Sequence, residues 1–254
     1  MWRTFFDSAA RLLFAPQCYV CNQELTELPG TDGLLNRFFC PECHEALIIN
    51  DCIRCNFCDA LLFQERPGTK YCSHCRGHEY HFDKVIALGL YDGLLRECAL
   101  MIKHPEHRHL AAALADALYL TRRKEFNALS PDWIVPVPMH ELRKQYRGVN
   151  DAEVIAQRLA ELMRKSYRDA VVRVQSTMPQ KDLGPQERRF NLQNAFRWKW
   201  WVEPEKPPES VLLVDDILTT GATGSEIAKM MKRSGVKNVW VAVIARAIGK
   251  NKQE

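Results

Sequence analysis

Short apolar runs alternate with segments that repeat apolar residues every three or four positions, from about residue 83 onward. The runs are typical of strands covered on both faces, and the longer segments are typical of amphipathic helices. Strands that alternate with helices favour a mainly parallel sheet with right-handed crossovers. We therefore predict an α/β domain. The predicted strands are Val85–Leu90, Ile134–Val137, Val171–Val174, Val211–Val214 and Val239–Ala245.

Two of the intervening helices have recognisable starts. Asn150 can cap a helix, with Glu153 three residues further on, and an apolar stripe follows this capping pattern. A second helix is expected after the turn that follows the strand Val211–Val214, and it should run to about Arg233. The stripe of the first helix comprises Val154, Ile155, Leu159, Leu162 and Met163.

The N-terminal segment predicts a further amphipathic helix. Asp7 and Arg11 interrupt the apolar core that a signal peptide would need. We expect this helix to dock on the body of the protein, with a helix lying on a membrane surface as the alternative. No apolar run reaches the roughly 20 residues of a membrane span, so we expect a cytoplasmic protein. The apolar positions are Trp2, Phe5, Phe6, Ala9 and Leu13.

Composition adds a second module to this picture. The chain has 254 residues, which is enough for one large core and a smaller unit. Nine of its ten cysteines lie between Cys18 and Cys75. We predict an N-terminal helix and double zinc-ribbon module over residues 1–80 and a larger α/β domain over residues 81–254. Cys98 stands apart on a predicted apolar helix and is interpreted as a core residue.

The clustered cysteines predict two structural zinc sites. They form CxxC pairs, and two such pairs supply the four thiolates of a tetrahedral site, whereas reduced thiols without a secretory signal do not favour disulfides. Cys52 also forms a CxxC with Cys55, so either Cys52 or Cys58 is spare, and we favour Cys58. An iron–sulfur cluster is the weaker alternative, and His44, His74 or His78 could replace a cysteine. The predicted zinc ligands are Cys18, Cys21, Cys40, Cys43, Cys55, Cys58, Cys72 and Cys75.

The charge distribution decides where an anionic partner would bind. Residues 1–80 contain 7 Lys and Arg against 10 Asp and Glu, whereas residues 81–254 contain 28 against 21. Two Zn(Cys)4 centres would each add a charge of about −2 to the first module. Because lysine and arginine dominate affinity for nucleic acid, any such binding is expected in residues 81–254.

The stretch Val211–Thr223 carries the clearest functional pattern. Four apolar residues form a strand, Asp215 and Asp216 follow at its carboxyl end, and a Thr/Gly/Ala/Thr turn leads into the next helix. Ligands of open α/β sheets bind beyond the carboxyl ends of the strands, and amides at a helix start bind anions. The turn, Thr219–Thr223, is therefore expected to hold the 5-phosphate of a ribose, and the aspartates its 2- and 3-hydroxyls. Neither GxxxxGK[ST] nor GxGxxG occurs.

This stretch closely resembles the phosphoribosyl pyrophosphate (PRPP) signature of the type I phosphoribosyltransferases. Nearly the whole chain resembles the ComF family, the competence-associated phosphoribosyltransferase-like proteins with an N-terminal zinc module. Further motifs in the family's order are the paired cysteines, Met101–Lys103, Val135–His140, Arg147–Asn150, Thr177–Gln180, Arg188–Asn191 and Ala195–Phe196.

The resemblance implies a type I phosphoribosyltransferase fold and a site for PRPP with Mg²⁺. It assigns the loop from Pro138 through His140 to Arg147 to the pyrophosphate, with Arg147 as the main contact. It assigns Lys181 and Arg188 to a mobile hood over the site. His140 is interpreted as orienting the loop, with proton transfer as the alternative role. The implied ribose 5-phosphate contacts are Asp215, Asp216, Thr219, Thr220, Gly221, Ala222 and Thr223.

Three positions depart from the family's usual pattern. Val149 replaces an aromatic residue, Asp151 replaces a glutamine, and Gln175 stands where an arginine is common. An acid beside a pyrophosphate pocket weakens anion binding unless it faces magnesium or solvent. These departures bear on turnover and little on the fold.

Two function classes follow. The first is a phosphoribosyltransferase that transfers phosphoribose to an amine, ammonia or a base, in DNA uptake or nucleotide metabolism. The second is a non-catalytic adaptor of the DNA uptake machinery that binds a nucleotide or single-stranded DNA. Arg197–Trp201 interleaves cations with aromatic rings that could stack on bases, although such aromatics on a hairpin more often pack on a sheet. A zinc-bound structural adaptor is a third, weaker reading.

Overall fold

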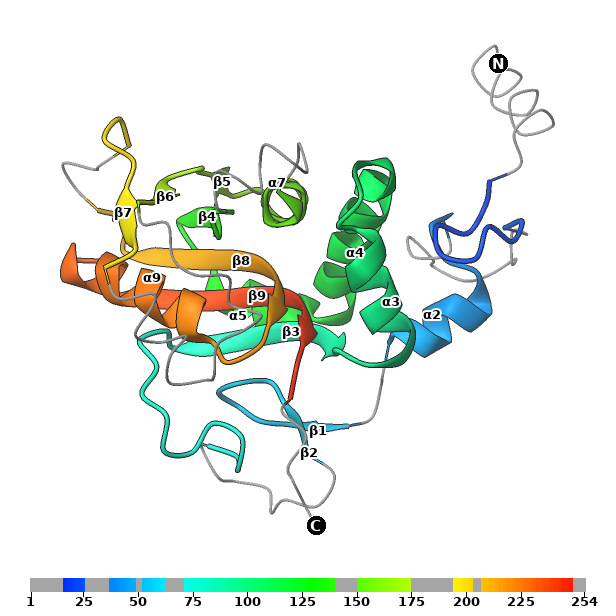
Figure 1. Ribbon diagram of the computed structural model, residues 1–254, viewed down its shortest axis with the longest axis horizontal. Helices are drawn as coiled ribbons and strands as arrows, with labels where there is room; N and C mark the ends of the chain where they lie inside the picture. Colours follow the sequence, from blue (N-terminus) through cyan, green and yellow to red (C-terminus); the bar gives the residue numbers. More distant parts are fainter. Residues whose placement is uncertain are drawn as a thin grey trace.

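The computed structural model describes residues 16–25, 37–48, 52–62, 71–139, 150–174, 194–202 and 207–248 (Figure 1). The expected N-terminal helix lies outside these residues. The elements, in chain order, are α2 (Pro41–Leu47), β1 (Ile53–Arg54), β2 (Leu61–Leu62), β3 (Lys84–Leu90), α3 (Gly93–Met101), η2 (Pro105–His107), α4 (Arg108–Thr121), α5 (Arg123–Leu129), β4 (Trp133–Pro136), α7 (Asp151–Met163), β5 (Ser166–Tyr167), β6 (Val171–Arg173), β7 (Phe196–Trp198), β8 (Ser210–Leu218), α9 (Ala222–Arg233) and β9 (Asn238–Arg246).

A five-stranded sheet forms the centre of the protein. Its strand order is β3-β9-β8-β4-β5, and all of the neighbouring strands pair in parallel. The α/β prediction is therefore confirmed, and four of the five predicted strands are in this sheet. The longest strands, β8 and β9, lie at its centre, where they are covered on both faces (Figure 1).

One predicted strand belongs elsewhere. Val171–Arg173 forms β6, which pairs antiparallel with β7 in a separate two-stranded sheet. The fifth strand of the parallel sheet is instead the short β5, Ser166–Tyr167, which the apolar pattern did not predict. Ser166 is exposed and Tyr167 is half-buried. A two-residue edge strand of this kind has no continuous apolar run.

Alternate residues of each strand point to opposite faces and build two separate cores. On β8, Leu212 and Val214 pack with the face that α3, α4 and α7 cover, whereas Val211 and Leu213 pack with the face that α9 covers. β3 and β9 alternate in the same way. Helix α7 begins as expected, since the Asn150 side chain accepts a hydrogen bond from the Ala152 amide at 3.2 Å.

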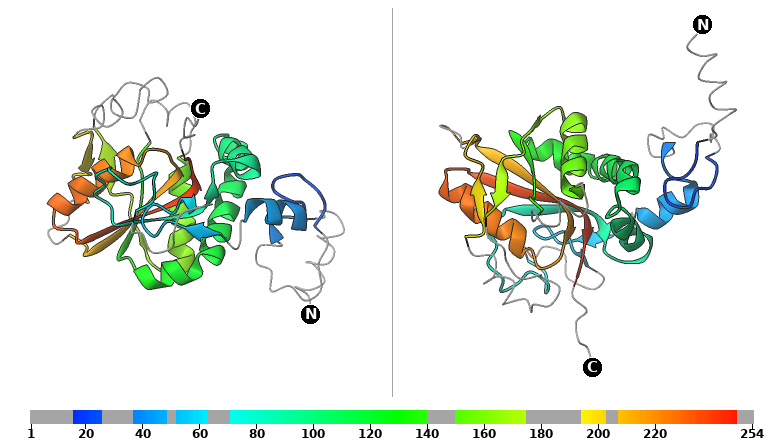
Figure 2. Two further views of the ribbon diagram at one scale, coloured as in Figure 1. Left: turned by 90° about the horizontal axis from the view of Figure 1, so that it is seen from below. Right: turned by 45° about the horizontal axis from the view of Figure 1, so that its top comes forward.

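The N-terminal cysteine-rich segments lie against this α/β body in two places. Helix α2 lies beside α3, and the β1–β2 hairpin lies below β3 in Figure 1; Figure 2 shows the same neighbours from two other directions. Cys98 is fully buried in the helix-covered core, as expected. Among the described residues, no helix is long and apolar enough to cross a bilayer.

Candidate functional site

Strand β8 carries the two adjacent aspartates to one edge of the sheet. Its residues Val211–Val214 are fully buried, whereas Asp215 and Asp216 are partly exposed. The strand continues through both aspartates to Leu218, so the pair lies within its last part rather than beyond it. Pairing of β8 with β9, which continues to Leu218, therefore fixes the backbone of both aspartates.

A lysine from a distant segment faces these acids. Lys103 follows α3, and its ammonium group contacts the carboxylate of Asp216 and lies 3.0 Å from Oδ2 of Asp151. Asp151 is the first residue of α7, and its side chain is 8% exposed. One cation thus bridges two carboxylates that come from different elements. The immediate neighbour of Asp151, the acid that departs from the family pattern, is therefore a lysine.

The two neighbouring aspartates have different surroundings. Burial raises the pKa of Asp215 to about 7; the charge of Lys103 opposes this shift and that of Asp151 adds to it. Asp215 accepts a hydrogen bond from the Asp216 amide at 2.9 Å, while Asp216 pairs directly with Lys103. Asp215 is therefore protonated more readily than an ordinary aspartate. Environments that separate two adjacent acids in this way are typical of functional sites.

The turn after β8 leads directly into α9. Gly221 precedes the helix with a φ of 73°, in the left-handed region that favours glycine. The Thr220 hydroxyl oxygen accepts a hydrogen bond from the Ala222 amide at 3.3 Å. Thr219 is exposed, and Thr223 is partly exposed. The turn therefore has the helix start and the hydroxyls that the sequence predicted for binding a phosphate.

A buried arginine fixes the beginning of this turn from the neighbouring strand. Nη1 of Arg246, the last residue of β9, donates to the backbone oxygens of Leu218, at 3.0 Å, and of Thr219. Its Nε is buried and has no partner among the described residues. Sequence reasoning missed Arg246; the one available signal was an arginine at the end of an otherwise apolar strand.

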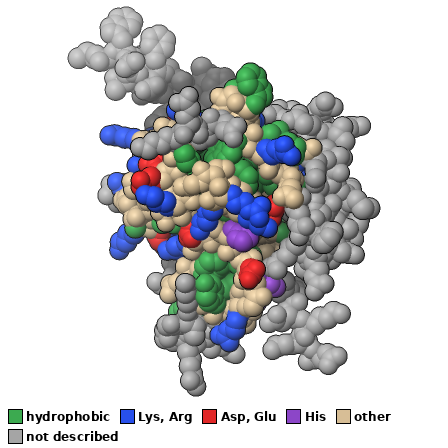
Figure 3. Space-filling view, turned by 90° about the vertical axis from the view of Figure 1, so that its left-hand side faces the viewer, with side chains coloured by type: hydrophobic (Ala, Val, Ile, Leu, Met, Phe, Trp, Pro, Cys, Tyr) green, Lys and Arg blue, Asp and Glu red, His purple; other side chains and the backbone are tan. Residues whose placement is uncertain are grey.

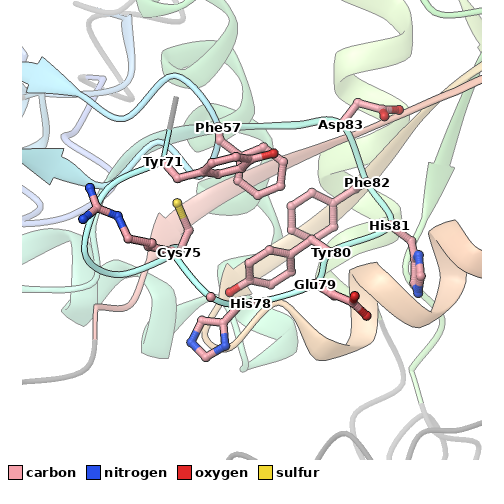
Figure 4. Close-up of a pocket in the computed structure, with 11 residues that line it drawn as sticks. Phe57, Tyr71, Cys75, His78, Glu79, Tyr80, His81, Phe82 and Asp83 are labelled. Carbon is pink, nitrogen blue, oxygen red and sulfur yellow. The ribbon is translucent and has the colours of Figure 1, made fainter. Parts of the chain in front are cut away.

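Aromatic side chains from the cysteine-rich segment lie against the same turn. A Cβ atom added to Gly221 would lie 2.8 Å from Cε1 of Tyr80 and 3.4 Å from the ring of Phe82. In Figure 4 these rings and Phe57 lie close to one another beside a cavity of about 590 Å³ that Cys75 also lines. The ring centroids of Tyr80 and Phe82 are 4.9 Å apart. Gly221 is thus required by both its φ and its neighbours.

The chain that carries these rings runs along α9. The His81 amide donates to the Ser225 hydroxyl at 3.1 Å, and the Asp83 carboxylate pairs with Lys232 at 2.5 Å. This segment therefore follows the helix from the Gly221 turn toward its C-terminal end. Sequence reasoning did not anticipate this contact, because it joins residues more than a hundred positions apart in the chain.

The cysteines form two compact clusters. In each cluster the four Sγ atoms lie within 4.8 Å of one another, a spacing that suits tetrahedral coordination of one ion. The second cluster contains Cys58 and not Cys52, as the sequence favoured, and neither cluster contains a histidine. The clusters are Cys18, Cys21, Cys40 and Cys43, and Cys55, Cys58, Cys72 and Cys75.

Burial and neighbouring thiols make these clusters suitable for a cation. Burial in the absence of a bound cation raises the pKa of Cys58 to about 12, and the charges of Cys55 and Cys72 contribute to this rise. A bound Zn²⁺ would stabilise the thiolates directly, because a coordinating thiol loses its proton. The four-thiol sets therefore fit two structural zinc ions.

Comparison with known sequences places this chain in a family. No family model matches the chain. Competence protein F of Haemophilus influenzae is 34% identical over 183 residues, which are 70% of this chain and 80% of that protein. The chain belongs to the ComF family. DNA utilization protein YhgH of Salmonella typhimurium is 30% identical over 181 residues, 70% of this chain and 78% of the relative.

Two solved structures show weaker likeness to this ComF-family protein. A purine phosphoribosyltransferase from Pyrococcus horikoshii is 14% identical, covers 63% of this chain and 78% of its own, and has a TM-score of 0.28. An adenine phosphoribosyltransferase from Leishmania donovani is 12% identical, covers 66% and 90%, and has a TM-score of 0.27. Similarity at this level adds nothing to the assignment, which rests on the sequence relatives.

The remaining residues that the ComF resemblance assigned are only partly described. Pro138 follows β4 and is half-buried. Beside it, the Val137 oxygen accepts from the side-chain amide of Asn150 at 3.0 Å, which joins the end of β4 to the start of α7. The other four residues lie outside the described residues, and their roles stay predictions. They are His140, Arg147, Lys181 and Arg188.

Proposed function

We propose that this ComF-family protein binds PRPP or ribose 5-phosphate with Mg²⁺ and transfers phosphoribose to an acceptor. The observation that carries this proposal is the joint placement of the aspartate pair and the Gly221 turn at the end of one strand. Asp215 and Asp216 offer acceptors for the ribose hydroxyls. The amides and hydroxyls of Thr219–Thr223 offer donors for the 5-phosphate.

In the proposed reaction, the bond between the ribose C1 and the pyrophosphate oxygen breaks, and pyrophosphate leaves with the electron pair. A bond forms between C1 and the nucleophilic atom of the acceptor, which gives up its proton. Cations near the leaving oxygens stabilise the negative charge that develops there. Arg147, Lys181 and Arg188 are proposed for this role.

Magnesium fits this site through its acids. Mg²⁺ prefers oxygen ligands and is commonly held by one or two carboxylates together with substrate phosphates. Asp215 and Asp216 supply carboxylates at the strand end. When bound with the pyrophosphate, the ion would neutralise charge on the leaving group. The chain's own contribution is to orient the ribose through the aspartates and to fix the phosphate in the turn.

The names of the relatives support a cellular context. The relatives are called a competence protein and DNA utilization proteins. We propose that this protein likewise acts in the uptake or use of DNA, in the cytoplasm, where PRPP and reduced zinc thiolates are found together. The acceptor would then be a molecule of nucleotide metabolism or part of the uptake machinery.

Calorimetry tests the proposal directly. The wild-type protein should bind PRPP and ribose 5-phosphate in the presence of Mg²⁺. Asp216→Asn should weaken both about 10- to 100-fold, because a charged hydrogen-bond partner of a hydroxyl is lost. A 5-phosphate ligand without ribose hydroxyls should be nearly indifferent to this change. Wild-type protein that binds neither ligand contradicts the proposal. Pyrophosphate release from PRPP that requires an added acceptor then separates transfer from binding alone.

A non-catalytic adaptor that binds nucleotide or single-stranded DNA is the second candidate. Trp200 and Trp201 are 83% and 62% exposed, and the Lys199 ammonium lies 5.4 Å from the Trp201 ring centroid. Trp198, in contrast, packs against Trp133. The face in Figure 3 carries several Lys and Arg side chains with acids among them. Exposed aromatics beside cations favour base stacking, which Trp200→Ala should weaken in a salt-dependent binding assay.

A further inference from the structure

Three carboxylates converge where the proposed function requires an anionic ligand. Asp215 and Asp216 lie on β8. The charge of Asp151, at the start of α7, contributes to the raised pKa of Asp215. A site with three acids and no cation would repel the phosphates of PRPP. The proposed function therefore requires a compensating charge from the protein in addition to that of Mg²⁺, and the resemblance assigned no role to the residue that supplies it.

Lys103 supplies this charge from a fixed position. Its amide donates to the Leu100 oxygen at 3.1 Å, so its backbone continues from the end of α3. Ile102 anchors the same segment in the core and is 2% exposed. The Lys103 side chain is only 20% exposed, and its ammonium group contacts both Asp151 and Asp216. Ion pairs that are this shielded are screened less by salt than surface pairs are.

We propose that Lys103 is a positioning residue of the ribose 5-phosphate site: it neutralises Asp151 and holds the Asp216 carboxylate for a ribose hydroxyl. This inference rests on the proposed function. A carboxylate has about four lone-pair sites, so Asp216 can accept from Lys103 and from a hydroxyl at once. The acid at position 151 is then compatible with PRPP, because Lys103 neutralises its charge and the acid no longer repels the ligand.

Variants that remove one or both charges separate this role from direct contact with the ligand. If Lys103 acts through Asp151, removing both side-chain charges restores the balance of the site. If Lys103 instead donates to the pyrophosphate, removal of Asp151 cannot replace that donor. The two single variants and the double variant therefore give different patterns for the two roles.

The experiment measures binding of PRPP with Mg²⁺ by calorimetry. Lys103→Met should weaken binding about 10- to 100-fold, and Asp151→Asn should tighten it about threefold. The double variant should bind at least about threefold more tightly than Lys103→Met without reaching wild type, because Asp151 no longer repels the ligand while Asp216 still lacks its cation. Lys237→Met is the matched control, since that lysine pairs with Glu209 at an exposed site, and it should have no effect. An unchanged affinity in Lys103→Met, or a double variant as weak as Lys103→Met, overturns the proposal.

Unfolding without ligand keeps the test independent of PRPP. Lys103→Met leaves Asp151 and Asp216 without their cation, so its unfolding temperature should fall, and Asp151→Asn in that background should recover part of the loss. Strictly additive effects of the two substitutions overturn the pairing itself. Wild-type protein that binds no PRPP while this coupling persists instead refutes the proposed function and leaves the lysine as a structural partner of the acids.

Discussion

The two cysteine clusters have the same composition but join the α/β body in opposite ways. The first cluster packs on the face of the sheet that α3 and α4 cover, where Cys18 and Cys40 share a core with Leu95. The second packs on the other face, where Cys55 and Cys75 share a core with residues of α9. Equal motifs thus occupy two different environments. The contacts around each cluster, rather than its four cysteines, determine how firmly the cluster is coupled to the sheet.

Polar contacts distinguish the second cluster most clearly. Asp59, which follows its first CxxC, is 3% exposed and accepts from both Arg122 and the Ala87 amide at 2.6 Å. The Val85 amide donates to the Phe57 oxygen at 2.8 Å. These bonds occupy the outer edge of β3, which is an edge strand of the sheet. Contacts along this edge hinder pairing with another chain, so the segment of the second cluster protects the edge of the sheet.

The first cluster is attached by side-chain packing. The hydrogen bonds described for residues 16–48 join residues of that segment to one another, such as the bond from the Tyr19 amide to the Phe38 oxygen. Cys21 is exposed, whereas all four cysteines of the second cluster are buried. Loss of metal from the first cluster should therefore have local effects, and loss from the second should reach the sheet and the Gly221 turn.

Removing one ligand from each cluster is the strongest test of this difference. Cys58→Ser and Cys21→Ser should each lower the zinc content from close to two ions per chain to close to one. Cys58→Ser should also lower the free energy of unfolding of the α/β body by more than about 3 kcal/mol, because structural zinc sites contribute folding energy directly. Cys21→Ser should leave that transition nearly unchanged. Metal analysis and urea denaturation measure both quantities.

Cys52→Ser is the control for these variants. Cys52 lies outside the second cluster, so this variant should keep both ions and wild-type stability. Equal destabilisation by Cys58→Ser and Cys21→Ser would show that the two clusters are equally coupled to the sheet, and retention of both ions in Cys58→Ser would show that Cys52 is the ligand.

Asp59→Asn tests the polar bond between the second cluster and the sheet. The substitution removes the charged partner of Nη1 and Nη2 of the buried Arg122 and leaves only Glu125 at its Nε. Breaking a buried ion pair typically costs about 3–5 kcal/mol of unfolding free energy. Glu209→Gln removes an exposed partner of Lys237 and should cost less than about 1 kcal/mol. Urea denaturation at one pH compares them. A cost for Asp59→Asn as small as that of Glu209→Gln would remove the polar coupling from the comparison.

The features that sequence reasoning predicted share a physical cause. Buried strands appear in the sequence as apolar runs, and the two cysteines of a CxxC pair lie three positions apart. The cap at Asn150 likewise lies within a few residues of its partner. Such signals need no knowledge of distant contacts. The aspartate pair and its turn belong to the same class, since strand, acids and helix start follow one another within Val211–Thr223.

The features that it missed depend on contacts between distant segments. Lys103 meets Asp151 and Asp216, and Tyr80 meets Gly221, only after the sheet has formed. The short strand β5 has no apolar run, because only Tyr167 is partly buried. The domain boundary predicted at residue 80 stays a prediction, and it falls within the segment that runs along α9.

Gly221→Ala sharpens the comparison at the turn that the second cluster's segment contacts. The left-handed φ of 73° costs a non-glycine residue about 1–2 kcal/mol, and the new Cβ would also meet the Tyr80 ring. We expect a total loss of about 2–3 kcal/mol in unfolding free energy. Tyr80→Ala in the same background should relieve the contact but not the backbone cost. A double variant that loses the sum of both single effects would place Tyr80 away from the turn.

Tyr19→Ala should have the smallest effect, because it changes packing on the side that has no described polar bond to the body. The Tyr19 ring makes an edge contact with His109 of α4, with centroids 4.6 Å apart, and a tilted contact with Phe38 at 5.4 Å. Aromatic pairs contribute about 0.5–1.5 kcal/mol beyond their buried area. The lost packing should therefore appear as faster zinc release to a coloured chelator from one of the two clusters, while the urea transition of the α/β body stays in place.

Tyr71→Ala is the matched control, since Tyr71 contacts Phe57 in the second segment and should not alter release from the first cluster. A shift of the whole transition by Tyr19→Ala would mean that packing alone couples the first cluster to the sheet as firmly as ion pairs couple the second.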